Sequence, residues 1–147
     1  MRMFSAVTLF LMAACGDDDG SGPASIDVTG TWSASVANMS GSGVSCTSSS
    51  PTQLTLTQTG TTFSGSYDGG VVDCSGPGGT LSSPLGSGSV TNGQLNGNAV
   101  SFDLGTPDLH HTGTASATSM SGTAVWTVEY GALGTFTLNG NWVAAKQ

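Results

Sequence analysis

Basic side chains are nearly absent from this chain of 147 residues. Two lysine and arginine residues stand against nine aspartate and glutamate residues, which gives a formal net charge of −7 at pH 7. Binding to nucleic acid depends on lysine and arginine that neutralise phosphates, and electrostatic binding to anionic lipid depends on the same side chains. We therefore expect no nucleic acid partner and no electrostatic attachment to a membrane.

The apolar stretch near the start of the chain is too short to cross a membrane as a helix. Residues 4–14 form a stretch of 11 residues, whereas a membrane-spanning helix needs about 20. A stretch of roughly 7–15 residues that follows a positive charge and ends in small residues is typical of a secretory signal. Arg2 supplies the charge, and Ala13 and Ala14 supply the small residues. The sequence therefore predicts export.

The residues Leu11-Met12-Ala13-Ala14-Cys15 resemble the cleavage site of bacterial lipoprotein signal peptides, in which the cysteine is acylated and becomes the mature N-terminus. The resemblance implies a signal peptide at 1–14, palmitate or a related acyl chain on Cys15, and a flexible Asp, Gly and Ser spacer at 15–27. It also implies a lipid-anchored protein of the cell envelope, at the outer membrane because Gly16 follows the cysteine. An ordinary secretory signal that ends near a cysteine is the alternative.

Cysteine is scarce, and its count of three is odd. If Cys15 carries lipid, Cys46 and Cys74 are left as an even pair in an oxidising compartment. With a two-residue turn at Gly60-Thr61, paired positions of the surrounding hairpin sum to 121, so residue 47 lies opposite residue 74. One bulge brings Cys46 opposite Cys74, and we predict a disulfide between them.

Helical periodicity is absent from residue 28 onward, where apolar residues alternate with Thr, Ser, Asn and Gln. Short turns are predicted at 59–61, 96–98 and 117–119, and Asn92-Gly93 is a rival turn that leaves the register of the fourth strand open. Consecutive hairpins favour an up-and-down sheet, and eight strands can close into a barrel. We therefore predict one all-β domain at 28–147, an antiparallel up-and-down eight-stranded β-barrel with strands at 28–36, 53–57, 62–67, 87–95, 100–104, 110–117, 120–130 and 136–144.

Two further patterns describe the expected barrel. The polar face of almost every strand predicts a barrel that shows water its polar side and keeps its apolar side inside, unlike a transmembrane barrel. A glycine also recurs between two apolar residues of the same face, which favours strong strand curvature beside bulky rings. These glycines are Gly30, Gly65, Gly122 and Gly140.

Gly30-Thr31-Trp32 in the first predicted strand resembles the signature of lipocalin and avidin barrels, in which a tryptophan plugs a small barrel. Residues 117–122 and Asn141-Trp142-Val143 are similar to the last strands of avidin-type barrels. The resemblance implies the same meander of strands. It does not imply biotin binding, because Met120 stands where avidins have an aromatic residue and their late aspartate and tryptophan have no counterpart.

Titratable side chains that could converge on one site are few. His110 and His111 are adjacent, so on a strand they point to opposite faces. No nucleophile elbow, phosphate-cradling loop or zinc-protease motif occurs in the sequence. We expect no enzymatic activity, no metal site and no cofactor; a surface metal at residues 108–111 is the alternative.

Two functions fit these patterns. The first is a monomeric, lipid-anchored protein whose barrel mouth holds a small apolar ligand. The alternative is a structural or protein-interaction surface lipoprotein with a filled barrel and no ligand. A cavity of several hundred Å³ would favour the first. The expected ligand-lining residues are Trp32, Phe63, Tyr67, Phe102, Trp126 and Trp142.

Overall fold

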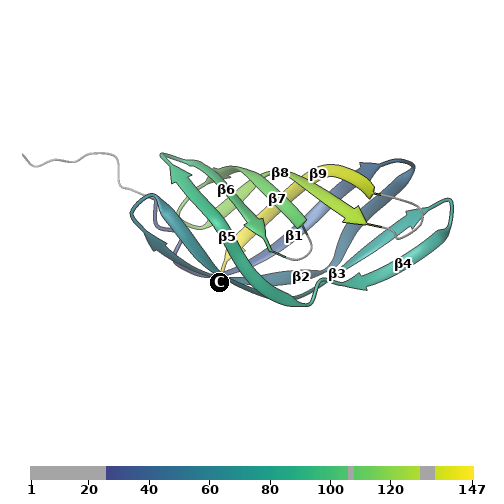
Figure 1. Ribbon diagram of the computed structural model, residues 1–147. Coiled ribbons are helices and arrows are strands. Elements are labelled where there is room, and N and C mark those ends of the chain that lie inside the picture. Colours follow the sequence, from purple (N-terminus) through teal and green to yellow (C-terminus); the bar gives the residue numbers. More distant parts are fainter. Residues whose placement is uncertain (1–25, 106–107, 130–134) are drawn as a thin grey trace, which may run out of the picture.

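The computed structural model describes residues 26–105, 108–129 and 135–147, which form a single β-structure (Figure 1). The predicted signal peptide, Cys15 and nearly all of the spacer lie outside the described residues, and so does Tyr130 of the predicted strand 120–130. Among the described residues there is no helix of the length and apolarity that crossing a membrane requires.

Nine strands follow one another along the described chain, and every pairing between them is antiparallel. All of them except β4 form a closed barrel in the order β2-β1-β9-β8-β7-β6-β5-β3, which the pairing of β2 with β3 closes. The predicted all-β, eight-stranded barrel is therefore confirmed. The strands are β1 (Gly30–Gly41), β2 (Val44–Thr59), β3 (Thr62–Gly76), β4 (Gly79–Pro84), β5 (Ser87–Asn96), β6 (Ala99–Leu104), β7 (Asp108–Ala115), β8 (Ser119–Glu129) and β9 (Thr135–Lys146).

The hairpin of β2 and β3 has the predicted register. From Ser50 to Thr59 of β2, each paired residue and its partner in β3 have residue numbers that add up to 121, as predicted. The register shifts by one between Ser48 and Ser50, at a bulge, and this shift brings Cys46 opposite Cys74. A disulfide joins the two cysteines. Both the bulge and the disulfide were predicted from the sequence.

β4 is a strand that the sequence did not predict. The first half of β3 pairs with β5, and its second half, from Val71 onward, pairs with β4. β2 and β3 are also longer than the predicted runs at 53–57 and 62–67. Leu81 is the only large aliphatic side chain of β4, so no alternation is visible in its sequence. Figure 1 shows β3 and β4 extending together past the end of the barrel.

The register of β5, left open by the sequence, is settled by a bulge. Asn96 pairs with Ala99, so the turn predicted at 96–98 is confirmed. The rival Asn92-Gly93 lies inside β5, where the pairing with β6 shifts between Thr91 and Gln94. Asn92 has a φ of 53°, and a Cβ at Gly93 would collide with Phe63 of β3. The bulged chain therefore requires glycine at Gly93 because it passes directly against its neighbour.

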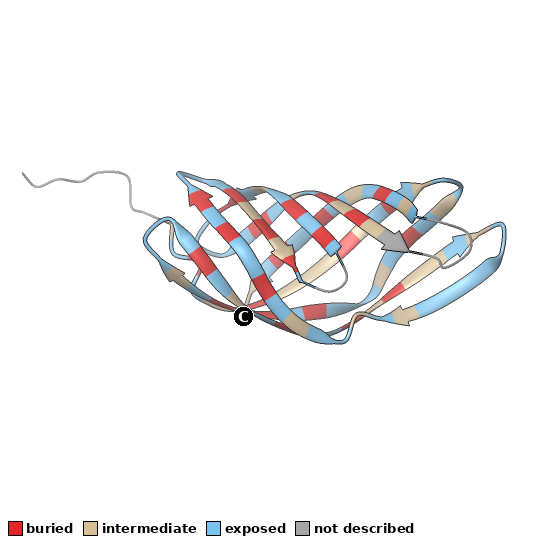
Figure 2. Cartoon of the chain, viewed as in Figure 1, coloured by how far each residue is buried: buried red, intermediate tan, exposed pale blue. Residues whose placement is uncertain are grey.

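Alternate residues of the strands fill the barrel interior, and the residues between them face water (Figure 2). A Cβ at Gly65 would collide with the carbonyl oxygen of Thr55, and a Cβ at Gly122 with that of Thr112. The recurring glycines of the inner face therefore mark close approach of backbones. The largest fully buried side chains are Trp32, Trp142, Tyr67, Phe102, Met39, Leu54 and Leu56.

One end of the barrel is closed by the segment that precedes β1. Trp32 is fully buried there, and its indole N–H donates to the carbonyl of Val28 at 2.8 Å. The side chain of Gln58 accepts from the Val28 N–H at 2.8 Å and donates to the carbonyl of Ile26 at 3.2 Å. Lys146 lies over the Trp32 ring, with Nζ 5.4 Å from its centroid. Trp32 and Val28 therefore close the barrel interior at this end.

Candidate functional site

At the opposite end, β4 and the adjoining parts of β2 and β3 form a three-stranded extension that we call the flap, residues 44–50, 71–76 and 79–84. Cys46, Cys74 and Leu81 are consecutive partners across these three strands and therefore share one face. The opposite face carries Asp73, which accepts a hydrogen bond from the Ser82 hydroxyl, and it also carries the pair of Val71 with Pro84 next to the barrel. The flap therefore presents the disulfide and Leu81 on one face, although it lies beyond the barrel proper.

The apolar face of the flap forms one wall of a cleft of about 590 Å³. Trp126 of β8 and Phe136 and Leu138 of β9 form the other wall. A volume of this size lies within the roughly 300–1,000 Å³ of ligand pockets. None of the described residues that line it carries a charge. The remaining lining residues are Ser42, Val44, Cys46, Cys74, Ser75, Gly76, Pro77, Gly78, Gly79, Thr80, Leu81 and Ser83.

The cleft lies where the barrel wall is incomplete. At its level the strands follow the order β8, β9, β1, β2, β3 and β4. β7 begins opposite Thr127, and β5 begins opposite Asp68, so β5, β6 and β7 do not extend to the flap. Among the described residues, no strand lies between β4 and β8 on this side of the cleft. Figure 2 shows that β4 is exposed along most of its length, and Leu81 itself is 52% exposed.

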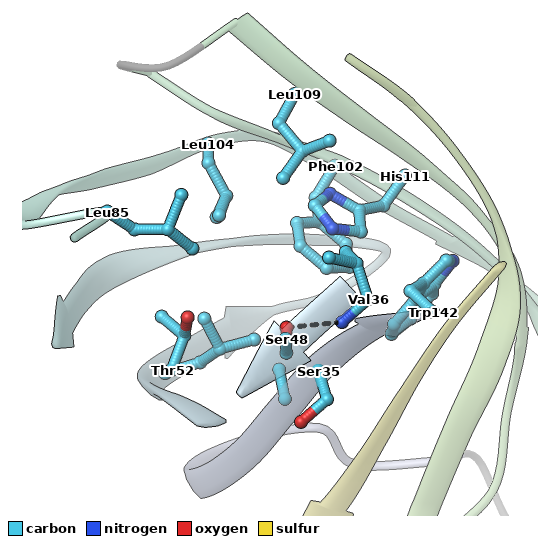
Figure 3. A pocket seen from close by; sticks show the side chains of 12 residues that line it. Ser35, Val36, Ser48, Thr52, Leu85, Phe102, Leu104, Leu109, His111 and Trp142 are labelled. Atoms are coloured by element: carbon cyan, nitrogen blue, oxygen red, sulfur yellow. Dashed lines mark hydrogen bonds between the residues drawn. The ribbon is translucent and has the colours of Figure 1, made fainter. Parts of the chain in front are cut away.

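The barrel interior itself is nearly filled. A small cavity of about 20 Å³ lies among β1, β2, β6, β7 and β9 (Figure 3). Space of this size corresponds to about one water molecule. The side chains drawn around it include Val36, Thr52, Phe102, His111 and Trp142. This cavity, as the described residues line it, is too small for a ligand of drug size, in contrast to the cleft.

His111 is a buried base in the wall of this small cavity. Its ring stacks on Phe102 with centroids 4.4 Å apart and meets the edge of Trp142 at 5.2 Å. Its Nδ1 is buried and has no hydrogen-bond partner in the described part of the chain. Burial lowers the pKa of His111 from 6.5 to about 4. The imidazole is therefore neutral near pH 7.

His110 points the other way, as predicted for adjacent strand residues. It lies on the outer surface, where its Nδ1 contacts the carboxylate of Asp103. Asn92 donates to the same carboxylate at 2.7 Å. Partial burial acts to raise the pKa of Asp103, but the hydrogen bonds from Asn92 and His110 outweigh it and lower that pKa. Within residues 26–105, 108–129 and 135–147, no three His, Cys, Asp or Glu side chains gather as a metal site would need.

The six expected ligand-lining residues are all buried, but they do not form one site. Trp126 lines the cleft, whereas Phe102 and Trp142 line the small cavity. The remaining three line neither space and pack in the core. Phe63 contacts Phe102 edge to face at 5.8 Å. Whether any of the six binds a ligand stays a prediction.

The sequence did not indicate the flap side of the cleft. Phe136 and Leu138 stand in a predicted alternating run, and only their position at its outer end distinguishes them from core residues. Leu81 stands alone among Gly, Thr, Ser and Pro, so no periodic signal could assign it to a wall. Comparison of the chain with models of protein families, with curated proteins and with solved structures finds no match.

Proposed function

We propose that the chain is an exported, lipid-anchored binding protein of the bacterial envelope that holds an apolar ligand in the cleft between the flap and the β8–β9 hairpin. The observation that carries the proposal is the cleft of about 590 Å³ with apolar side chains on both walls. Binding sites are typically concave, mostly apolar spaces of this size. Acylated Cys15 and the spacer to residue 27 would hold this domain near the membrane.

The composition of the two walls narrows the kind of ligand. The described lining residues carry no charge, so they offer no partner to an acidic headgroup. The indole N–H of Trp126 is buried without an acceptor among the described residues. That N–H is closed to solvent in this structure, so it offers no donor to a ligand in the cleft. We therefore expect an uncharged, largely apolar ligand.

A structural lipoprotein without a ligand is the second candidate. The observation that favours it is the filled interior, where the cavity measures about 20 Å³. Barrels of eight strands can be filled by their own side chains. The two candidates differ at the cleft alone, so an experiment on the cleft separates them.

The test compares two exposed apolar side chains. Leu81 (52% exposed) lines the cleft, whereas Val143 (57% exposed) lies on the outer face of β9 and does not line it. We expect the neutral dye N-phenyl-1-naphthylamine to bind with a saturable rise in fluorescence. Leu81→Ser removes a side chain that can bury apolar area against the dye, so its dissociation constant should rise roughly three- to tenfold. Val143→Ser should leave the constant unchanged.

Both variants replace an exposed residue, so neither should alter the fold, and circular dichroism checks this. Absence of any dye response would favour the structural candidate. Equal effects of the two substitutions would place the dye elsewhere and contradict binding in the cleft.

A further inference from the structure

The outer edge of β4 carries unpaired backbone groups. β4 is the last strand of the sheet order and pairs with β3 alone among the described strands. The Leu85 N–H donates to the Gly70 carbonyl at 3.1 Å, next to the pair of Pro84 with Val71. Hydrogen-bonded pairs alternate along an antiparallel ladder, so positions 79, 81, 83 and 85 bond β3.

The other positions of β4 face away from β3. Thr80 and Ser82 each direct an N–H and a C=O outward, and Pro84 offers a carbonyl without an N–H. These groups run along the rim of the cleft, because Thr80 and Leu81 of the same strand line it. A free strand edge and an apolar space therefore lie side by side.

An extended polypeptide is the ligand that matches both features. Its backbone presents donors and acceptors at the spacing of a strand, and alternate side chains point to one face. A strand added to β4 would continue the barrel wall toward β8, across the gap left by β5, β6 and β7. Its side chains on the face of Leu81 would enter the cleft between Leu81 and the wall that contains Trp126.

We propose that the cleft binds an extended segment of a partner protein, which pairs with β4 as an added strand and places an apolar side chain in the cleft. This inference rests on the proposed function. It specifies that the apolar ligand in the cleft is a side chain of a bound polypeptide segment. The chain has nine acidic and two basic residues, and Asp73 lies on the outer face of the flap beside Ser82. Electrostatic attraction therefore favours a segment with basic residues at its outward positions.

The edge is suited to a short segment. Only Thr80 and Ser82 offer both backbone groups outward, between Gly79 at one end and Pro84 at the other. Short edges that contain proline limit further strand addition, which otherwise leads to aggregation. One bound segment is compatible with this edge, whereas an extended stack of chains is not.

The test uses Ser82→Pro, with Ser82→Ala as the matched control. Both substitutions remove the hydroxyl that bonds Asp73, but only proline removes the outward N–H. The bonds to β3 are made at positions 79, 81, 83 and 85, so proline at position 82 leaves them in place. The probe is an acetylated and amidated heptapeptide of alternating threonine and leucine with a lysine at each end, and its control carries N-methyl groups on the amides that would face β4.

We expect the heptapeptide to bind the wild-type chain and Ser82→Ala equally, and Ser82→Pro at least about tenfold more weakly. The N-methylated peptide should bind weakly to all three. N-phenyl-1-naphthylamine should still bind Ser82→Pro, since the dye needs the cleft and not the edge.

Four results would overturn the inference. The dye could bind without the heptapeptide, or the methylated peptide could bind as well as the unmethylated one. Either result would contradict pairing of an added strand with β4 and would leave the cleft as a site for small molecules. Self-association that Ser82→Pro abolishes would make a second copy of the chain the occupant and also contradict the monomer expected from the sequence. Failure of both dye and peptide to bind would remove the proposed function itself.

Discussion

At the scale of single residues, His111 shows how burial changes the chemistry of a side chain that the sequence could only place on a face. Adjacent strand residues alternate, so one histidine of the pair had to point inward. Inside, His111 stacks on Phe102, and its Nδ1 has no partner in the described part of the structure. His110 of the same pair is exposed and contacts Asp103. Two identical side chains therefore have opposite environments.

This burial predicts a loss of stability in weak acid. The pKa of His111 is about 4 in the folded chain, whereas its ordinary value is 6.5, so the unfolded chain binds the proton more tightly. The free energy of unfolding should be highest above pH 6.5, should fall as the pH drops toward 4, and should lose on the order of 3 kcal/mol in total. Urea unfolding followed by tryptophan fluorescence at several pH values measures this.

His111→Phe keeps the stack on Phe102 and removes the titrating group, so it should flatten the decline. His110→Gln, on the outer surface, should keep it. A wild-type chain whose unfolding free energy is level between pH 6.5 and 4 would contradict the assignment, and so would an unchanged decline in His111→Phe.

At the scale of elements, the long β2–β3 hairpin determines the shape of the site. Its near half belongs to the barrel, and its far half holds β4 and forms the flap. The disulfide between Cys46 and Cys74 crosses the far half and lines the cleft. The disulfide therefore has two effects. It restricts the unfolded chain, and it holds together two strands that form a wall of the candidate site.

Replacing both cysteines by serine should weaken the flap first. The disulfide closes a loop with a sequence separation of 28 residues, which corresponds to about 3–4 kcal/mol in the chain-entropy model. We expect a loss of this size in urea unfolding. Hydrogen exchange should quicken more at Val72, Leu81 and Ser83 of the flap than at Leu54 and Trp142 of the barrel. Equal protection in both parts, or unchanged stability, would contradict a role of the disulfide in holding the flap.

At the scale of the whole molecule, the two ends of the barrel differ. One end is closed by Trp32 and by the segment at 26–29, and the other opens at the flap. The described chain begins at the closed end, so an anchor that precedes residue 26 would attach on that side. A ligand that enters the cleft would then approach from the side opposite the predicted attachment.

The lipid anchor is tested by labelling with radioactive palmitate in a bacterial host. We expect the label on the wild-type chain and its loss in Cys15→Ala, because acylation requires the thiol of that residue. The variant with serine at both Cys46 and Cys74 is the control and should keep the label. Label on the Cys15→Ala chain would contradict the lipoprotein signal, and a secreted chain without label would favour the ordinary secretory signal.

The sequence by itself determined the barrel, the β2–β3 register and the disulfide. These depend on local rules, because alternation sets which residues face inward and a two-residue turn at Gly60 sets which residues pair. The bulge that brings Cys46 opposite Cys74 was predicted from the same counting. The inward position of Trp32, Trp126 and Trp142 follows from alternation as well.

Only the tertiary structure decided where the barrel is filled and where it is open. The cleft exists because β2, β3, β8 and β9 extend past the ends of β5, β6 and β7, and relative strand lengths around a barrel are a non-local property. β4 pairs with the far half of β3, which β5 leaves without a partner on that edge. The sequence of β4 contains no alternation of apolar and polar residues that would predict a strand. Leu81 therefore becomes part of a cleft wall through pairing with Cys74, a contact that no pattern along β4 itself encodes.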